Sequence, residues 1–250
     1  MTVWLVLVPG LPLAVALLAA SRLLRPRVAA LAPLTLLPAL AAALAPGQPA
    51  ARFDWLLLGT RLGVDATGRV FLLFSAVAWL CAALYGRAWL AADPRRARFF
   101  GFFLAAAAGT LGACIAQDAV TFYLFFALRT FSAWGLVLHR ATPVARRAGT
   151  VYVVLAVIGE AALLAALWLV VAAGGLHLAS APAAVAASAW RDAIVAFLLI
   201  GFGAKAGVLG LHVALPLAYG AAPVPGAAAL ASAIIKAGLL GWLRFLPLGF

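Results

Sequence analysis

Four ionisable residues lie inside long apolar segments and could carry protons: Arg129, Glu160, Lys205 and Lys236. An ionised side chain at the bilayer centre costs from about 3 to more than 10 kcal/mol unless it faces another charge or water. A desolvated lysine can exchange a proton near neutral pH, whereas arginine keeps its charge. We therefore predict a polar row across the membrane midplane, in which Lys205, Lys236 and Glu160 transfer protons and Arg129 is a fixed positive charge.

Lysine usage supports a special role for Lys205 and Lys236. They are the only lysines among 18 basic residues, and both lie within apolar runs rather than in loops. Two alternatives stay open. The lysines could extend to an interface, and Arg129 with Glu160 could form a static ion pair between two antiparallel helices.

Downstream of Lys205, the sequence predicts an interrupted helix. His212 follows Lys205 by seven residues, which is two turns along one helix face. It could pass a proton on or cap a break. Pro216, Pro223 and Pro225 cannot all lie in one unbroken helix, and broken helices at membrane depth line polar cavities. The alternative is a short apolar turn between two ordinary helices.

The composition is typical of a polytopic membrane protein of the all-α class. The chain is 68% hydrophobic and 10% charged, with a mean hydropathy of +1.17, and its apolar runs are continuous rather than alternating. We predict eight transmembrane helices, of which the seventh is discontinuous. Their ranges are 3–20, 28–45, 68–90, 99–116, 119–138, 149–173, 192–211 and 226–246. The small-residue stretch 174–191 is expected to hold a short interfacial helix.

The arginines are interpreted as topology signals that contact the lipid bilayer. The net charge is +12, but the arginines cluster between apolar runs with few aromatic residues, which argues against a nucleic-acid partner. Loops after the first, third and fifth spans are the basic ones. The positive-inside rule then predicts a multi-pass protein of the cell inner (plasma) membrane with its amino terminus outside.

The sequence contains no motif for a cofactor or a metal. Cys81 and Cys114 lie in apolar segments without neighbouring ligands, and we find neither a dinucleotide fingerprint nor a histidine pair at haem spacing. We expect electron transfer to occur in other subunits, so the chain is not expected to be catalytic alone.

Residues 62–246 resemble the antiporter-like membrane subunits of respiratory complex I, formate hydrogenlyase-type hydrogenases and Mrp sodium/proton antiporters. The most specific stretch begins GFGAKAGVLGLHVALPLAYGAAPVPG at residue 201. The resemblance implies that Lys205 and Lys236 correspond to the lysines of the seventh and eighth helices. It also implies that His212 and Pro216 belong to the helix break, and that these residues line a proton half-channel.

The chain departs from this family in charge and in length. Ala127 stands where the fifth helix usually carries a glutamate, Ala214 replaces a tryptophan and Tyr219 replaces a histidine. The family has about fourteen helices in two inverted five-helix repeats, and only the first repeat is expected here. We divide the chain into an amino-terminal region, 1–60, with two helices and an outer loop, and a truncated antiporter-like domain, 61–250.

Three functions remain open. The first is a proton-conducting subunit of a redox-driven or antiporter complex, such as an NADH-quinone oxidoreductase or a hydrogenase, with other membrane subunits as partners and possibly another chain supplying helices 9–14. The second is a structural or assembly subunit that has lost the pump, which Ala127 and the missing repeat favour. The third is a stand-alone channel or carrier.

Overall fold

The computed structural model describes residues 3–56, 59–208 and 212–248, and all of their side chains except those of Val3 and 233–235. Residues 209–211, where the predicted seventh span ends, lie outside this description. The described elements are mainly helical and begin with α1 (Val3–Leu18), the short helices η1 (Arg25–Arg27), α2 (Val28–Leu31) and η2 (Leu34–Leu36), α3 (Leu37–Leu44), β1 (Ala50–Phe53) and β2 (Thr60–Gly63). They continue with α4 (Ala66–Trp89), α5 (Arg96–Ile115), α6 (Ala119–Val137), α7 (Pro143–Ala172), α8 (Ala181–Ala187), α9 (Arg191–Ala206), α10 (Ala214–Ala221) and α11 (Val224–Phe245).

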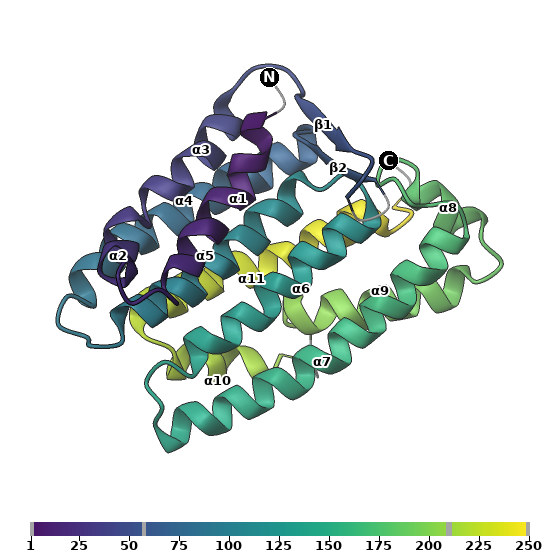
Figure 1. The fold of residues 1–250 in the computed structure, drawn as a ribbon. Coiled ribbons are helices and arrows are strands. Elements are labelled where there is room, and N and C mark those ends of the chain that lie inside the picture. Colours follow the sequence, from purple (N-terminus) through teal and green to yellow (C-terminus); the bar gives the residue numbers. More distant parts are fainter. Residues whose placement is uncertain (1–2, 57–58, 209–211, 249–250) are drawn as a thin grey trace.

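The long helices lie side by side and form a bundle with two distinct ends (Figure 1). We call one the basic end, where the connections 19–27, 90–95 and 138–142 lie with arginines in them and in the adjoining helix ends, and the other the hairpin end, which holds β1, β2 and α8. In cross-section, α1 packs on α5, α5 on α6, α6 on α7 and α7 on α9, and α11 packs against both α9 and α4. The gathering of these arginines at one end of the bundle agrees with the positive-inside pattern. Which side of the membrane the basic end faces remains a prediction.

Five described helices are long and apolar enough to cross a membrane: α4, α5, α6, α7 and α11. The pair formed by 25–31 and 34–44 is bent by 54° and adds a sixth if it counts as one span. The remaining predicted spans fall on α1, with 16 residues, and on α9 with α10. The chain is therefore a membrane protein with several spans, and the full number of eight remains a prediction.

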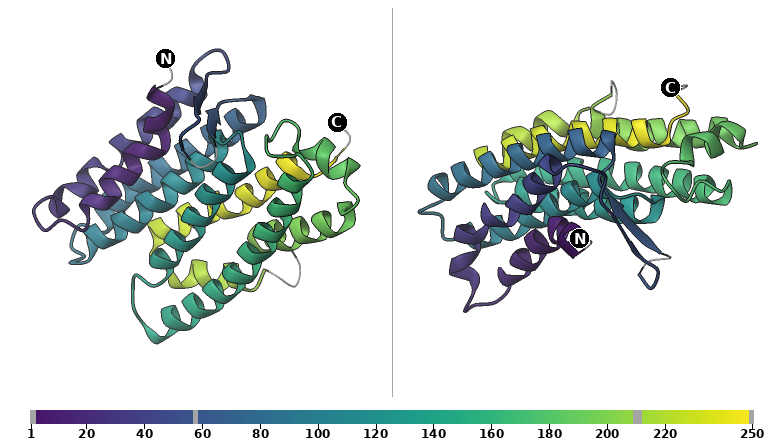
Figure 2. Two further views of the ribbon diagram at one scale, coloured as in Figure 1. Left: turned by 45° about the vertical axis from the view of Figure 1, so that its right-hand side comes forward. Right: turned by 90° about the horizontal axis from the view of Figure 1, so that it is seen from above.

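A β-hairpin interrupts the expected all-α fold. Strands β1 and β2 pair antiparallel, with Ala51 opposite Leu62 and Arg52 opposite Arg61, and they project from the helices when the bundle is seen from above (Figure 2). The two strands lie within the predicted outer loop, 46–67. The side-chain carboxylate of Asp118 accepts a hydrogen bond from the backbone N–H of Arg61 at 2.8 Å and thereby fixes the hairpin to the start of α6.

Side-chain caps define where three of the long helices begin. Asp65 accepts a hydrogen bond from the N–H of Gly68 in α4, Asp118 from Thr121 in α6, and Thr142 from Ala145 in α7. Each cap satisfies one of the free backbone donors of the first turn. These helices therefore begin at positions that their own sequence specifies.

The seventh predicted helix is present as two separate helices. α9 ends at Ala206, and Gly207 follows it with φ +80°, a left-handed conformation that favours glycine. α10 begins at Ala214. The interruption thus lies before the prolines: Pro216 lies within the first turn of α10, Pro223 caps α11 and Pro225 lies in its first turn.

Candidate functional site

A buried ion pair lies beside the interruption. Nζ of Lys205, in the last turn of α9, lies 3.8 Å from Oε1 of Glu160, near the middle of α7. Their side chains are only 4% and 5% exposed. The separation is within salt-bridge range but longer than a hydrogen bond. The two groups therefore attract each other electrostatically without a direct hydrogen bond. The carboxyl end of α9 adds a partial negative charge that favours a cation at Lys205.

Two glycines bring α7 and α9 close enough to form this pair. A Cβ added to Gly201 of α9 would lie 2.9 Å from the carbonyl oxygen of Gly159, and one added to Gly159 would lie 3.5 Å from that of Gly201. Small residues at a crossing allow membrane helices to approach closely. Gly159 directly precedes Glu160, and Gly201 is one turn before Lys205, so the crossing sets the separation of the pair.

Arg129 of α6 belongs to the same buried region. Its side chain is almost fully buried, and its guanidinium carbon lies 4.2 Å from the ring centroid of Phe126, one turn earlier. Arg129 interacts electrostatically with both Glu160 and Lys205. Three of the four residues in the predicted polar row are therefore brought together, from α6, α7 and α9.

Tyrosines surround these charges, and we did not anticipate Tyr123 or Tyr152 from the sequence. The hydroxyl of Tyr152 donates a hydrogen bond to the carbonyl oxygen of Thr130 at 3.1 Å, and the ring centroid of Tyr152 lies 5.5 Å from Nζ of Lys205. The hydroxyl of Tyr123 approaches the carbonyl oxygen of Glu160 at 3.5 Å. The only signal in the sequence is the presence of aromatic residues in spans five and six, and no pattern indicates that these hydroxyls lie near the charged groups.

Lys236 does not join this group through any described contact. Its Nζ lies 3.1 Å from the ring centroid of Phe74 in α4, and the Phe74 ring is half-exposed. Lys205 instead interacts electrostatically with Glu160 and Arg129. The predicted row through spans five to eight is thus limited, among the described residues, to α6, α7 and α9.

His212 lies on the far side of the interruption. Because α9 ends at Ala206, the expected two helical turns between Lys205 and His212 do not exist, and that prediction is wrong. His212 is half-buried, and its Nδ1 has no hydrogen-bond partner among the described residues. Gly207 caused the error: the sequence pattern continues through it, but its left-handed backbone ends the helix.

Two polar contacts outside this region were also not predicted. At the basic end, buried His139 contacts Asp93 through Nε2 and Oδ2 at 2.9 Å. Burial lowers the pKa of His139 below 6.5 despite the hydrogen bond to Asp93. At the hairpin end, Arg244 binds the carboxylate of Asp65 with both terminal nitrogens, one of them at 2.8 Å.

The site has no candidate metal-binding cluster. No group of three or more His, Cys, Asp or Glu side chains with suitable geometry occurs in the described ranges 3–56, 59–208 and 212–248. The arrangement consists of one carboxylate, one amine and one guanidinium in an apolar setting. It can bind or release a proton at the amine or the carboxylate, and it can hold a fixed positive charge beside them.

The chain is similar in sequence to membrane subunits of several multi-subunit complexes. The family described as NADH:quinone oxidoreductase/Mrp antiporter, TM matches residues 116–250. Hydrogenase-4 component B of Escherichia coli strain K12 is 27% identical over 186 residues, which are 73% of this chain and 28% of that protein. NADH-quinone oxidoreductase subunit N of Desulforudis audaxviator strain MP104C is 29% identical over 199 residues, covering 75% and 38% respectively.

The fold has a counterpart among solved structures. A chain of the Mrp complex from Dietzia sp. DQ12-45-1b superposes with a TM-score of 0.84 at 24% identity, covering 98% of this chain and 28% of the other. The chain therefore spans well under half the length of the relatives described above.

Proposed function

Because the chain belongs to the NADH:quinone oxidoreductase/Mrp antiporter transmembrane family, we propose that it is a membrane subunit of a proton-translocating oxidoreductase or cation/proton antiporter complex. It provides a half-channel in which Lys205 and Glu160 transfer protons. The observation that carries this proposal is the buried Lys205–Glu160 pair at 3.8 Å, formed where α9 is interrupted.

The charges of the site favour Lys205 as the group that changes protonation. When all three groups are ionised, Arg129 and Lys205 carry two positive charges against the single negative charge of Glu160. Arginine keeps its proton, so the buried site reaches neutrality when Lys205 is the uncharged member. Loading Lys205 then adds one positive charge, which Glu160 partly compensates.

Transfer between the pair requires a small movement. An N–H bond of the Lys205 ammonium breaks, its electron pair stays on Nζ, and the proton forms a bond to a carboxylate oxygen of Glu160 or to a water between them. Direct transfer needs an approach to about 2.6–3.2 Å, compared with the 3.8 Å separation. Both side chains end in freely rotating bonds, so rotamer changes can open and close this step.

The remaining groups extend the proposed path. His212, beyond the interruption, passes the proton on toward α10, and Lys236 continues the path on α11. Partner membrane subunits, or a chain that supplies the helices beyond the eighth, complete the route across the membrane.

The decisive experiment measures proton uptake by vesicles that contain the reconstituted complex. Lys205→Ala removes the exchanging amine, and Lys205→Arg keeps the charge but cannot release a proton; both are expected to abolish translocation. The matched control is Arg191→Gln, an exposed arginine at the start of the same helix. Assembly is checked by size-exclusion chromatography, and unchanged translocation by Lys205→Ala contradicts the proposal.

A second candidate function is a non-pumping structural or assembly subunit. Ala127 favours it, because the resemblance places a glutamate there. The two functions differ in their response to Glu160→Gln. A pump loses translocation with assembly intact, whereas a structural subunit shows either unchanged translocation or loss of the whole complex.

A further inference from the structure

At the basic end, the face formed by α1, α5 and α6 carries a surface furrow. The proposed proton path does not use this furrow. One open cavity of about 530 Å³ lies between α1, α5 and α6. A second of about 330 Å³ lies between the starts of α5 and α7 and the end of α6. The two cavities share Arg98 and Phe102, so they adjoin each other, and we call them together the furrow. Both volumes lie within the range of about 300–1,000 Å³ that small ligands occupy.

The floor and walls of the furrow are apolar. Gly101 and Ala105, one turn apart on α5, form its floor, Leu13 and Leu17 of α1 form one wall, and Leu128 lies on the α6 side. An added Cβ on Gly101 would lie 2.9 Å from the Cβ of Ala19, so the chain packs closely on α5 there and the furrow follows the apolar side chains beside this contact. Such a shape fits a hydrocarbon chain lying along the helices.

The mouth of the furrow is positively charged. Arg25 lines the larger cavity, Arg146 the smaller one and Arg98 both, and all three side chains are exposed. Neither lining contains a carboxylate, and none of the three arginines has an ion pair in the described part of the chain. The neighbouring carboxylate, Asp93, is engaged by His139 and by the backbone N–H of Arg95.

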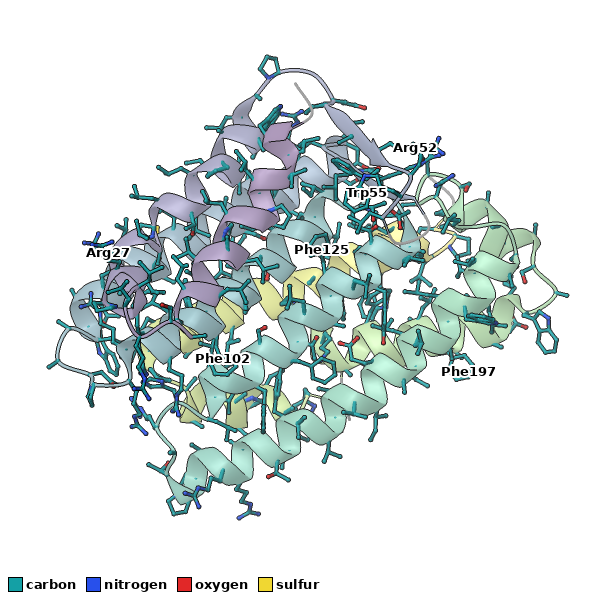
Figure 3. All side chains as sticks on the ribbon, in the orientation of Figure 1. Arg27, Arg52, Trp55, Phe102, Phe125 and Phe197 are labelled. Atoms are coloured by element: carbon teal, nitrogen blue, oxygen red, sulfur yellow. The ribbon has the colours of Figure 1, made fainter. Side chains whose placement is uncertain are left out.

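The arginines lie at the level where the headgroup of a lipid at the membrane interface is expected. Arg98 and Arg146 lie in the first turns of α5 and α7, where free backbone N–H groups add partial positive charge. Phe102 and Trp134 are partly exposed at the same level, and aromatic side chains of this kind are enriched at membrane interfaces. Figure 3 shows Phe102 on the near face, toward the end of the bundle where Arg27 lies and opposite Arg52 and Trp55.

We propose that this furrow binds one anionic phospholipid. Its phosphate lies at Arg98, flanked by Arg25 and Arg146, and one acyl chain lies over Gly101 and Ala105. The charge of the mouth selects an anionic headgroup, because basic pockets between helices recognise such lipids. The apolar floor favours a phospholipid over a free phosphate or a polar peptide, because only the lipid has a hydrocarbon chain to cover it.

The test is native mass spectrometry of the full-length protein after delipidation and addition of phosphatidylglycerol or phosphatidylcholine. We expect selective retention of phosphatidylglycerol. Arg25→Gln/Arg146→Gln should weaken it about 25-fold, because each arginine near the surface contributes about a fivefold gain in affinity. The matched control is Arg22→Gln/Arg147→Gln, two exposed arginines of the same connections that do not line the furrow.

A second pair of variants tests the acyl-chain position. Ala105→Leu fills the floor and should lower retention, whereas Ala88→Leu on the exposed face of α4 should not. Equal retention of the two lipids, or equal weakening by the two arginine pairs, overturns the proposal. Photo-crosslinking from position 102 that captures a polypeptide instead of lipid also overturns it, since a partner protein would then occupy the furrow.

Discussion

Gly159 of α7 and Gly201 of α9 face each other at the point where the two helices cross, so closely that a Cβ on Gly201 would lie 2.9 Å from the carbonyl oxygen of Gly159. This contact is the structural basis of the Lys205–Glu160 separation. The geometry of the proposed proton transfer therefore depends on two glycines, which have no ionisable side chain.

Gly201→Ala should push α7 away from α9 and reduce proton translocation several-fold, because the new Cβ would clash with Cγ of Leu163 and would lie 2.9 Å from the carbonyl oxygen of Gly159. The carbonyl of Gly159 is backbone and cannot rotate away as a side chain would, so the helices must shift. The control is Gly220→Ala in α10, where an added Cβ meets no atom within 4 Å and helix propensity improves. Equal activity of the two variants, measured in vesicles, would show that the crossing does not control the pair.

Ala127→Glu should restore translocation to the inactive Glu160→Gln variant. Position 127 is one turn after Tyr123, whose hydroxyl approaches the carbonyl of Glu160, so a carboxylate there lies on the side of α6 that faces α7. The new carboxylate would put a negative charge on α6, the helix on which the family resemblance places a glutamate. Ala127→Gln, which adds the same volume without charge, is the control and should give no rescue.

Arg244→Gln should lower the stability of the bundle by about 1.5–3 kcal/mol, the usual contribution of hydrogen bonds to a charged group. Arg244 is buried and binds Asp65, which also caps α4. Arg244→Lys should rescue little, because an ammonium cannot form the two-pronged contact. Thermal unfolding in detergent measures the effect, and Arg191→Gln, which changes an exposed arginine, should leave the midpoint unchanged.

The stability of the basic end should decrease as the pH falls below about 6.5. Burial lowers the pKa of His139, so the folded state holds this histidine neutral and binds protons less readily than the unfolded chain. Its stabilising contribution is complete above the unfolded value of 6.5 and is lost as the pH falls through the lower folded value. The Asp93 pKa is also lowered: burial raises it, but the hydrogen bonds from His139 and the backbone of Arg95 outweigh this, so its contribution is lost only below 3.8.

His139→Gln tests this dependence, because glutamine keeps a hydrogen-bonding group but does not titrate. Unfolding midpoints at pH 7.5 and 5.5 should differ less in the variant than in the unchanged protein. An identical pH difference in both proteins would show that another group is responsible.

The sequence was informative wherever solvation cost or hydropathy decides the structure. The apolar runs correctly located α4 to α7, and the family resemblance is confirmed by the match over residues 116–250. The cost of burying charge also predicted that Glu160 would balance Arg129 or Lys205, and the structure places Glu160 3.8 Å from Lys205. Both inferences depend on hydropathy and on the cost of burying a charge, which can be judged from each segment of the sequence by itself.

The failures concern backbone conformation and long-range contacts. The left-handed Gly207 ended a helix that periodicity extended to His212. The hairpin was missed because its strands have only four residues each. Asp93 and His139 are 46 residues apart, and Asp65 and Arg244 are 179 apart, so no local pattern could reveal either pair.

The Asp65–Arg244 contact also constrains the order of assembly. Ribosomes release the chain from its amino terminus, so α4 is complete long before Arg244 exists. During that interval the carboxylate of Asp65 keeps only its cap on α4, and the groove that later receives α11 stays open to lipid or to a chaperone. The arrival of Arg244 allows α11 to be fixed against α4, so this single contact can report, in pulse-chase proteolysis, when synthesis has passed α11.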